Sequence, residues 1–199
     1  MTFVEAEHPR AAAGTFAEKS QTAPELSLGG REERDLHDSG AIAEVRTFGP
    51  NGDITSITRY ADAVDEEGAP VPETIQHFAN RQFHDPEPGV AAQQILTDGV
   101  VTARVHHWHG SIHDPDPETP AVRLVSPDGS SIEMHYSAGK KQDPAPGVPA
   151  EVHTLKGGQR RSTWFTAGIP TKQQDVLPGT GAPFFGSGDL VFTRTNDAT

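Results

Sequence analysis

Apolar and polar residues alternate in short runs along the central part of the chain, and Gly or Pro residues interrupt these runs at regular intervals. Alternation with a period of two is typical of a strand that buries one face, and Asp-Gly pairs between two such runs are typical of hairpin turns. The clearest example is the pair of runs at 122–125 and 131–136, on either side of Asp128-Gly129. The pattern therefore predicts β-hairpins rather than helices.

These hairpins belong to a repeat, because the blocks 84–112, 113–141 and 142–170 align without a gap, apart from a one-residue slip in the first turn. Each block has 29 residues, and five of the aligned columns are identical. A fixed period of this kind indicates tandem units that stack on their neighbours. The identical columns are Asp85, Asp114 and Asp143; Pro86, Pro115 and Pro144; Pro88, Pro117 and Pro146; Ala92, Ala121 and Ala150; and Gly110, Gly139 and Gly168.

The middle block allows its register to be predicted. A two-residue turn at Asp128-Gly129 would mix apolar and polar side chains on each face of the hairpin. A three-residue loop, with Pro127 first and Gly129 in the left-handed position, instead pairs Leu124 with Ile132. The apolar side chains then share one face, as a half-buried hairpin requires, and these are Val122, Leu124, Ile132, Met134 and Tyr136.

We expect the first block to follow the same rule. Its predicted apolar side consists of Ile95, Val101, Ala103, Val105 and His107. Upstream, 54–60 resembles the second strand of a unit, and 65–71 resembles a divergent form of the connector between units.

The predicted architecture is all-β, with tandem 29-residue β-hairpin repeats that form a curved antiparallel meander sheet. Residues 1–40 form a polar N-terminal arm, either flexible or extended along a partner or the sheet. Residues 41–170 form the β-hairpin repeat domain. Residues 171–199 form a Gly/Pro loop followed by a closing strand at 189–193.

Charge and cysteine content narrow the functional classes. With 28 acidic and 16 basic residues the net charge is -12, which disfavours nucleic-acid binding and favours a basic partner. No apolar run is long enough to cross a membrane, and the first ten residues do not form a cationic, apolar leader. The chain has no cysteine, so it has neither disulfides nor zinc–thiolate sites. A cytoplasmic or virion location is expected.

A His-rich stretch at 106–113 is the most evident candidate for a metal site, because imidazole nitrogens bind zinc, nickel or copper. The alignment favours a structural interpretation. His106 shares a column with His135 and Trp164, His107 shares one with Tyr136 and Phe165, and His113 shares one with His84 and Gln142. Only His109 is particular to its block. On one continuous strand, His107 and His109 would also point away from His106.

A second candidate is a contact face for a partner, made of side chains on the polar side of the hairpins. Histidines there would change charge near pH 6.5, and the alternative is that they are simply solvated. The residues assigned to this face are His77, His106, His135, Trp164 and Trp108. In the middle connector, Asp114, Asp116 and Glu118 could bind calcium, but a turn-capping role is preferred because no glycine lies between them.

The unit, with its Asp-Gly turns, the aromatic residue before Gly139 and Gly168, and the connectors at His84, His113 and Gln142, resembles the MORN-variant β-hairpin repeats of bacterial and phage proteins. The resemblance covers about 54–168, and the double proline and the repeat length depart from the common form. Some proteins of that kind are labelled antitoxins or immunity proteins. The resemblance therefore implies a protein-binding role.

The chain lacks a nucleophile elbow, a His-Glu-x-x-His helix, a phosphate loop and a dinucleotide fingerprint, and neither an enzyme nor a cofactor is expected. The first hypothesis is a non-catalytic, protein-binding repeat module, immunity- or antitoxin-like in a bacterial or phage setting. The second is a phage or virion structural protein that uses its N-terminal arm for assembly. The third is a metal-dependent enzyme centred on His106, His107, His109 and His113.

Overall fold

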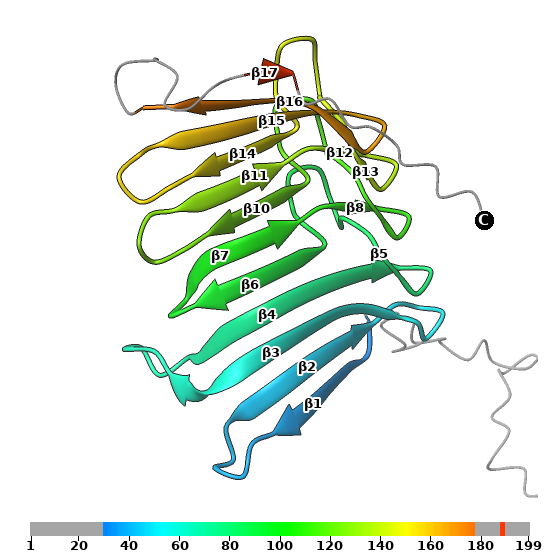
Figure 1. Ribbon diagram of the computed structural model, residues 1–199. Helices are drawn as coiled ribbons and strands as arrows, with labels where there is room; N and C mark the ends of the chain where they lie inside the picture. Colours follow the sequence, from blue (N-terminus) through cyan, green and yellow to red (C-terminus); the bar gives the residue numbers. More distant parts are fainter. Residues whose placement is uncertain (1–29, 178–187, 190–199) are drawn as a thin grey trace, which may run out of the picture.

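The computed structural model describes residues 30–177 and 188–189, and in these residues every regular element is a strand (Figure 1). Twelve strands follow one another in an antiparallel meander, and a thirteenth, β5, pairs beside β4. None of the described residues lies in a helix that is long and apolar enough to cross a membrane. In spatial order the strands are β1 (Glu32–Leu36), β2 (Ile42–Phe48), β3 (Ile54–Val64), β4 (Pro70–Ala79) with β5 (Gln82–Phe83), β6 (Gln93–Thr97), β7 (Val100–Val105), β10 (Val122–Val125), β11 (Ser131–Met134), β14 (Glu151–Thr154), β15 (Arg160–Thr166), β16 (Ile169–Val176) and β17 (Gly188–Asp189).

The register predicted for the middle block is confirmed. In the β10–β11 hairpin Val122 pairs with Met134 and Leu124 pairs with Ile132. The Ser126 N–H donates to the Ser130 carbonyl oxygen at 2.8 Å, which leaves a loop of three residues. Gly129 has φ +84°, as the left-handed position of such a loop requires. The hydrophobic pattern was therefore sufficient to define this hairpin.

The first block departs from the expected rule. Thr97 pairs with Val100, so Asp98-Gly99 forms a two-residue turn, and both of its residues have positive φ. A register shift between Ile95 and Leu96 accommodates an extra residue on β7. Ile95 therefore pairs with Ala103, but Val101 pairs with Leu96 on the other face.

Two segments outside the three blocks also differ from expectation. The stretch 65–71, interpreted as a connector, contains the hairpin turn between β3 and β4, in which the Asp65 N–H donates to the Ala69 carbonyl oxygen at 2.9 Å. Strand β1 falls within the predicted arm, since residues 32–36 pair with β2. Of the predicted closing strand at 189–193, only Asp189 lies in the described part of the chain, at the end of β17.

A second set of turns, which the sequence did not reveal, produces very short hairpins at one end of the sheet (Figure 1). They consist of β8 (His107–Trp108) with β9 (Ser111–Ile112), and β12 (Tyr136–Ser137) with β13 (Lys140–Lys141). Their turns, His109-Gly110 and Ala138-Gly139, have positive φ at both residues, which identifies type I′ turns. His109 therefore lies in a turn and not on a strand.

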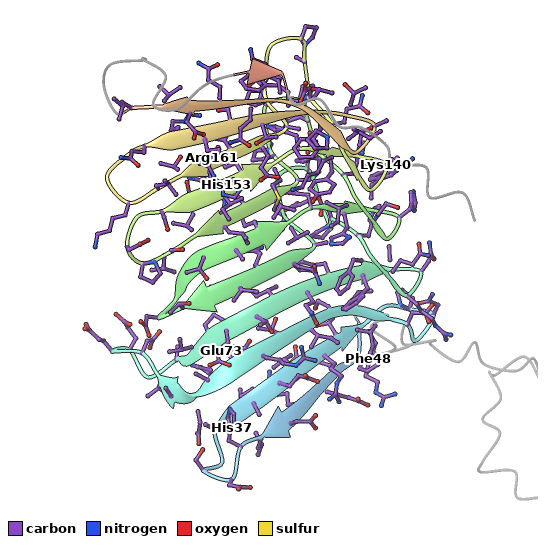
Figure 2. All side chains as sticks on the ribbon, viewed as in Figure 1. His37, Phe48, Glu73, Lys140, His153 and Arg161 are labelled. Atoms are coloured by element: carbon purple, nitrogen blue, oxygen red, sulfur yellow. The ribbon has the colours of Figure 1, made fainter. Side chains whose placement is uncertain are left out.

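The buried core is made of small side chains. The most buried residues are Ala91, Ala92, Ala121 and Ala150, at 1% exposure or less, and no large side chain among the described residues is fully buried. Figure 2 shows side chains crowding around the short hairpins at this same end of the sheet. The rings of Phe78 and Phe83 stack there with centroids 4.9 Å apart, and His107 follows at 5.2 Å from Phe83. Packing is therefore concentrated where the short hairpins and the connectors meet the strands.

Candidate protein-binding surface

Two of the histidines assigned to a contact face, His106 and His135, are buried at 3% and 9% exposure. Their ring Nδ1 atoms donate to carboxylates in the connectors, His106 to Asp85 at 2.6 Å and His135 to Asp114 at 2.8 Å. A side chain held in this way cannot contact a partner, so the prediction of a contact face is wrong for these two residues. The sequence missed the pairing because the aspartate precedes its histidine by 21 residues.

The same aspartates also accept hydrogen bonds from the backbone. The Asp114 Oδ1 accepts from the N–H groups of Ala121 and Tyr136, each at 2.8 Å. Asp85 does the same for Ala92 and His107, and Asp143 does so for Ala150 and Phe165. Burial alone would raise the pKa of Asp85, but the hydrogen bonds from His106 and from the backbone hold the pKa of that carboxyl below its usual value. These aspartates therefore fasten each connector to the strands beside it.

The other three residues of the predicted face have different surroundings. His77 is half-buried, and burial lowers the pKa of its imidazole. Trp164 is also half-buried, and the Lys172 ammonium lies 4.6 Å from its ring centroid. Trp108 is 57% exposed. Of the five residues proposed, only Trp108 is largely open to solvent.

Trp108 belongs to an exposed aromatic cluster with His84 and His109. The His84 ring centroid lies 4.8 Å from that of Trp108 and 5.0 Å from that of His109. The His84 Nδ1 accepts a hydrogen bond from the His109 backbone N–H at 3.3 Å, so this imidazole supports the turn. His113 plays the same role for Ala138 at 3.4 Å. The position of His84 in this cluster is therefore explained by its hydrogen bond to the turn.

The His-rich stretch does not converge on one point. His106 faces Asp85, the His107 Nε2 contacts the Gln93 amide oxygen at 3.2 Å, and His109 occupies a turn. Burial lowers the pKa of His107, and its Nδ1 has no hydrogen-bond partner. Over residues 30–177 and 188–189, no three His, Cys, Asp or Glu side chains are grouped as metal ligands. Asp116 caps its own turn, accepting from the N–H groups of Glu118 and Thr119 at 2.8 Å each.

One face of the sheet carries a contiguous group of apolar side chains, here called the apolar band. Cross-strand partners share a face, and the registers of β6, β7, β10 and β11 place Ile95 beside Ala103 and Leu124 beside both Ala103 and Ile132. In Figure 1 the short hairpins and connectors gather at one end of these strands, and no other described residues form a layer over the rest of them. The band consists of Ile95, Ala103, Val105, Val122, Leu124, Ile132 and Met134.

Ion pairs flank this band on the same face. On β14 Glu151 pairs with Lys141 and accepts a hydrogen bond from the His153 ring at 2.5 Å. Burial alone would raise the pKa of Glu151. The two neighbours outweigh burial, so the pKa of this carboxyl is lowered. On β15 and β16 Arg161 binds both oxygens of Asp175, at 2.8 and 3.0 Å; Figure 2 labels His153 and Arg161. Charged side chains therefore border the band on one side, and an apolar centre with polar side chains at its margin is the usual composition of a protein-binding surface.

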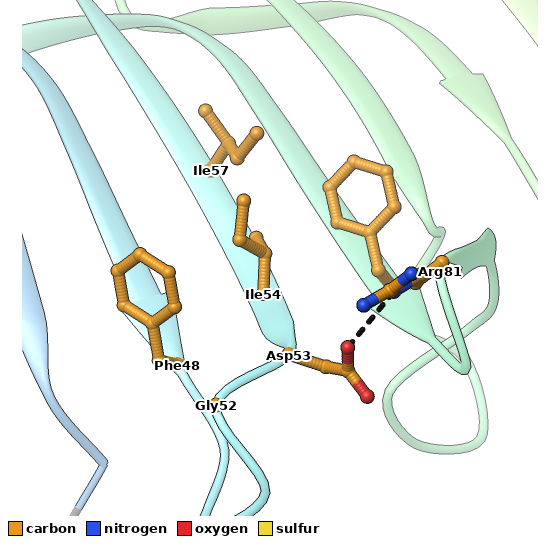
Figure 3. Close-up of a pocket in the computed structure, with 7 residues that line it drawn as sticks. Phe48, Gly52, Asp53, Ile54, Ile57 and Arg81 are labelled. Atoms are coloured by element: carbon orange, nitrogen blue, oxygen red, sulfur yellow. Dashed lines mark hydrogen bonds and ion pairs between the residues drawn. The ribbon is translucent and has the colours of Figure 1, made fainter.

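A pocket of about 400 Å³ lies farther along the sheet, between the β2–β3 hairpin and the end of β4 (Figure 3). Phe48, Ile54, Ile57 and Phe78 supply most of its lining. At its rim the Arg81 Nε donates to the Asp53 Oδ1 at 3.0 Å. The pocket is therefore apolar inside and charged at its edge, which suits an aliphatic or aromatic group.

No family model matches the chain, and no curated protein matches it. The function is therefore inferred from the surfaces of the described residues.

Proposed function

We propose that the protein is a non-catalytic protein-binding module that uses the apolar band as its contact surface. The observation that carries this proposal is an apolar sheet face that no described residue covers, at which Ile95 is 51% exposed, whereas Ala103 and Val122 are buried among their neighbours. A contiguous, partly exposed apolar surface beside charged side chains is characteristic of partner-binding sites.

We further propose that this surface is built from 29-residue repeats stacked into a curved sheet. The recurrence of one backbone hydrogen bond supports the repeat. The N–H groups of His77, His106 and His135 donate to the carbonyl oxygens of Ala92, Ala121 and Ala150, each at 2.7 Å. Each donor lies 29 residues after the previous one, as does each acceptor. Units joined in this way present equivalent side chains at regular intervals to a partner.

The overall charge indicates the kind of partner. The net charge of -12 would accelerate association with a basic protein, whereas the apolar band would supply most of the binding free energy. An immunity- or antitoxin-like role, as the resemblance to MORN-variant repeats implies, is consistent with such a surface. The products of genes encoded beside this one are accordingly the first partners to test.

The test compares two neighbouring residues of β6 that point to opposite faces. Ile95→Arg places a charge in the band, and Gln94→Arg places the same charge on the opposite face. Immobilised wild type and Gln94→Arg should retain a basic protein from the native lysate or from the adjacent genes. Ile95→Arg should bind that protein at least about tenfold more weakly. Equal retention by Ile95→Arg, or no retention by the wild type, would contradict the proposal.

A further inference from the structure

The pocket in Figure 3 lies at one end of the row of stacked rings. Phe83 covers one side of Phe78, with ring centroids 4.9 Å apart, and His107 continues the row beyond Phe83. Phe78 also lines the pocket together with Ile54, Ile57 and Phe48, and these side chains enclose the pocket instead of filling it. One or two further apolar side chains would complete the packing there.

The chain enters the described region at the rim of this pocket. The Phe48 N–H donates to the Arg31 carbonyl oxygen at 2.8 Å, and the Arg31 guanidinium carbon lies 5.2 Å from the Phe48 ring centroid. Gly30 is pressed against the Phe48 backbone, since a Cβ atom at Gly30 would lie 2.3 Å from the Phe48 carbonyl oxygen. Residues 1–29 therefore connect to the sheet at a fixed point beside the pocket.

The residues that come directly before this point have the chemistry that the pocket requires. Leu26 and Leu28 are apolar, and Gly29 between Leu28 and Gly30 allows a sharp change of direction. An extended chain spans at most about 3.6 Å per residue, so Leu28 lies within about 7 Å of Gly30 and Leu26 within about 14 Å. Both can reach a pocket whose wall includes Phe48.

We propose that Leu26 and Leu28 of the chain's own N-terminal segment occupy the pocket lined by Phe48, Ile54, Ile57 and Phe78. The short tether favours this occupant over a second copy or another protein, because a tethered group acts at an effective concentration on the order of millimolar. The proposal goes beyond partner binding at the apolar band and does not depend on it.

Disulfide trapping in the full chain tests the proposal directly, because the natural sequence contains no cysteine. Leu28→Cys is combined with Ile57→Cys, which lines the pocket, or with Thr58→Cys, the next residue of β3, which points to the opposite face. Under mild oxidation the first pair should form an intramolecular disulfide at least about tenfold faster than the second. Equal rates for the two pairs would overturn the proposal. Disulfide-linked dimers of the first pair would also overturn it, by assigning the pocket to a second copy.

A second measurement leaves the pocket itself unchanged. The double variant Leu26→Ser, Leu28→Ser in the full chain should bind the dye ANS several-fold more strongly than the wild type, because the pocket is then open to the dye. The control Phe3→Ser, Val4→Ser removes apolar side chains from the same segment and should leave dye binding at the wild-type level. An unchanged signal in the first variant would count against occupation by these leucines.

Discussion

Replacing Asp114 by alanine removes a carboxylate that accepts three hydrogen bonds. The Ala121 and Tyr136 N–H groups donate to one of its oxygens, and the His135 ring donates to the other, all at 2.8 Å. Ala121 is completely buried and His135 is 9% exposed, so water cannot readily replace the lost acceptor. A buried donor left without a partner costs about 1 to 3 kcal/mol. With partial relaxation, we expect the three donors together to cost about 3 to 5 kcal/mol of the free energy of unfolding.

Urea unfolding followed by far-ultraviolet circular dichroism measures this loss. The control is Asp128→Ala, which removes an exposed carboxylate that accepts from Ser130 within its own turn. Its effect should be several-fold smaller, because water replaces the lost acceptor at an exposed turn. Asp114→Asn should fall between the two, since the amide oxygen can still accept from the backbone. If Asp114→Ala and Asp128→Ala destabilised the protein equally, the aspartate would not fasten the connector in the way described.

The remaining predictions concern a strained turn and the pH dependence of stability. Ala138 has φ +48°, a conformation that costs an L-residue about 1 to 2 kcal/mol. Ala138→Gly should therefore raise the melting temperature. The control Ser137→Gly, in strand β12, should lower the melting temperature. A lower melting temperature for Ala138→Gly would contradict the claim that the backbone of Ala138 is strained. Burial lowers the pKa of His77 and His107 below 6.5, so the unfolded chain binds more protons between the folded and unfolded pKa values, and stability should decrease as pH falls below about 6.5. His107→Phe, which introduces the residue found at Phe165, should flatten this dependence, and a profile parallel to that of the wild type would contradict it.

The β10–β11 hairpin could be predicted from the sequence because both of its determinants are local. Its alternating apolar residues select one face, and Pro127 and Gly129 select the loop. The observed pairs, Val122 with Met134 and Leu124 with Ile132, follow from these two signals. The next hairpin also has a three-residue loop, closed by Leu155 and Gln159, but Gly157 and Gly158 both have positive φ there.

The short hairpins could not be predicted so readily, because their turns carry weak signals. His109 and Ala138 occupy left-handed positions that usually contain Asn, Asp or Gly. Only the following residues, Gly110 and Gly139, indicated a turn, and a single glycine is equally typical of the end of a strand. Contacts from distant residues support these conformations, since the His109 N–H donates to the His84 ring and the Ala138 N–H donates to the His113 ring.

The buried His–Asp pairs depend on contacts distant in sequence. His135 comes directly after strand β11, and its side chain would be exposed to solvent if no other segment covered the end of that strand. The connector that begins at Asp114 covers it instead, and no local pattern reveals this crossing. The candidate contact face was therefore misassigned at His106 and His135, whereas the apolar band followed from the alternation itself.

The charged first strand has a consequence for self-association. Strand β1 is the edge strand of the sheet formed by the described residues, and four of its five residues, Glu32, Glu33, Arg34 and Asp35, are charged. An edge strand of another molecule would bring like charges together and separate the Arg34–Glu32 pair, which has an N–O distance of 2.6 Å. Protonation of the three carboxylates in acid would remove much of this barrier. Acidic conditions should therefore be where edge-to-edge aggregation into fibres begins.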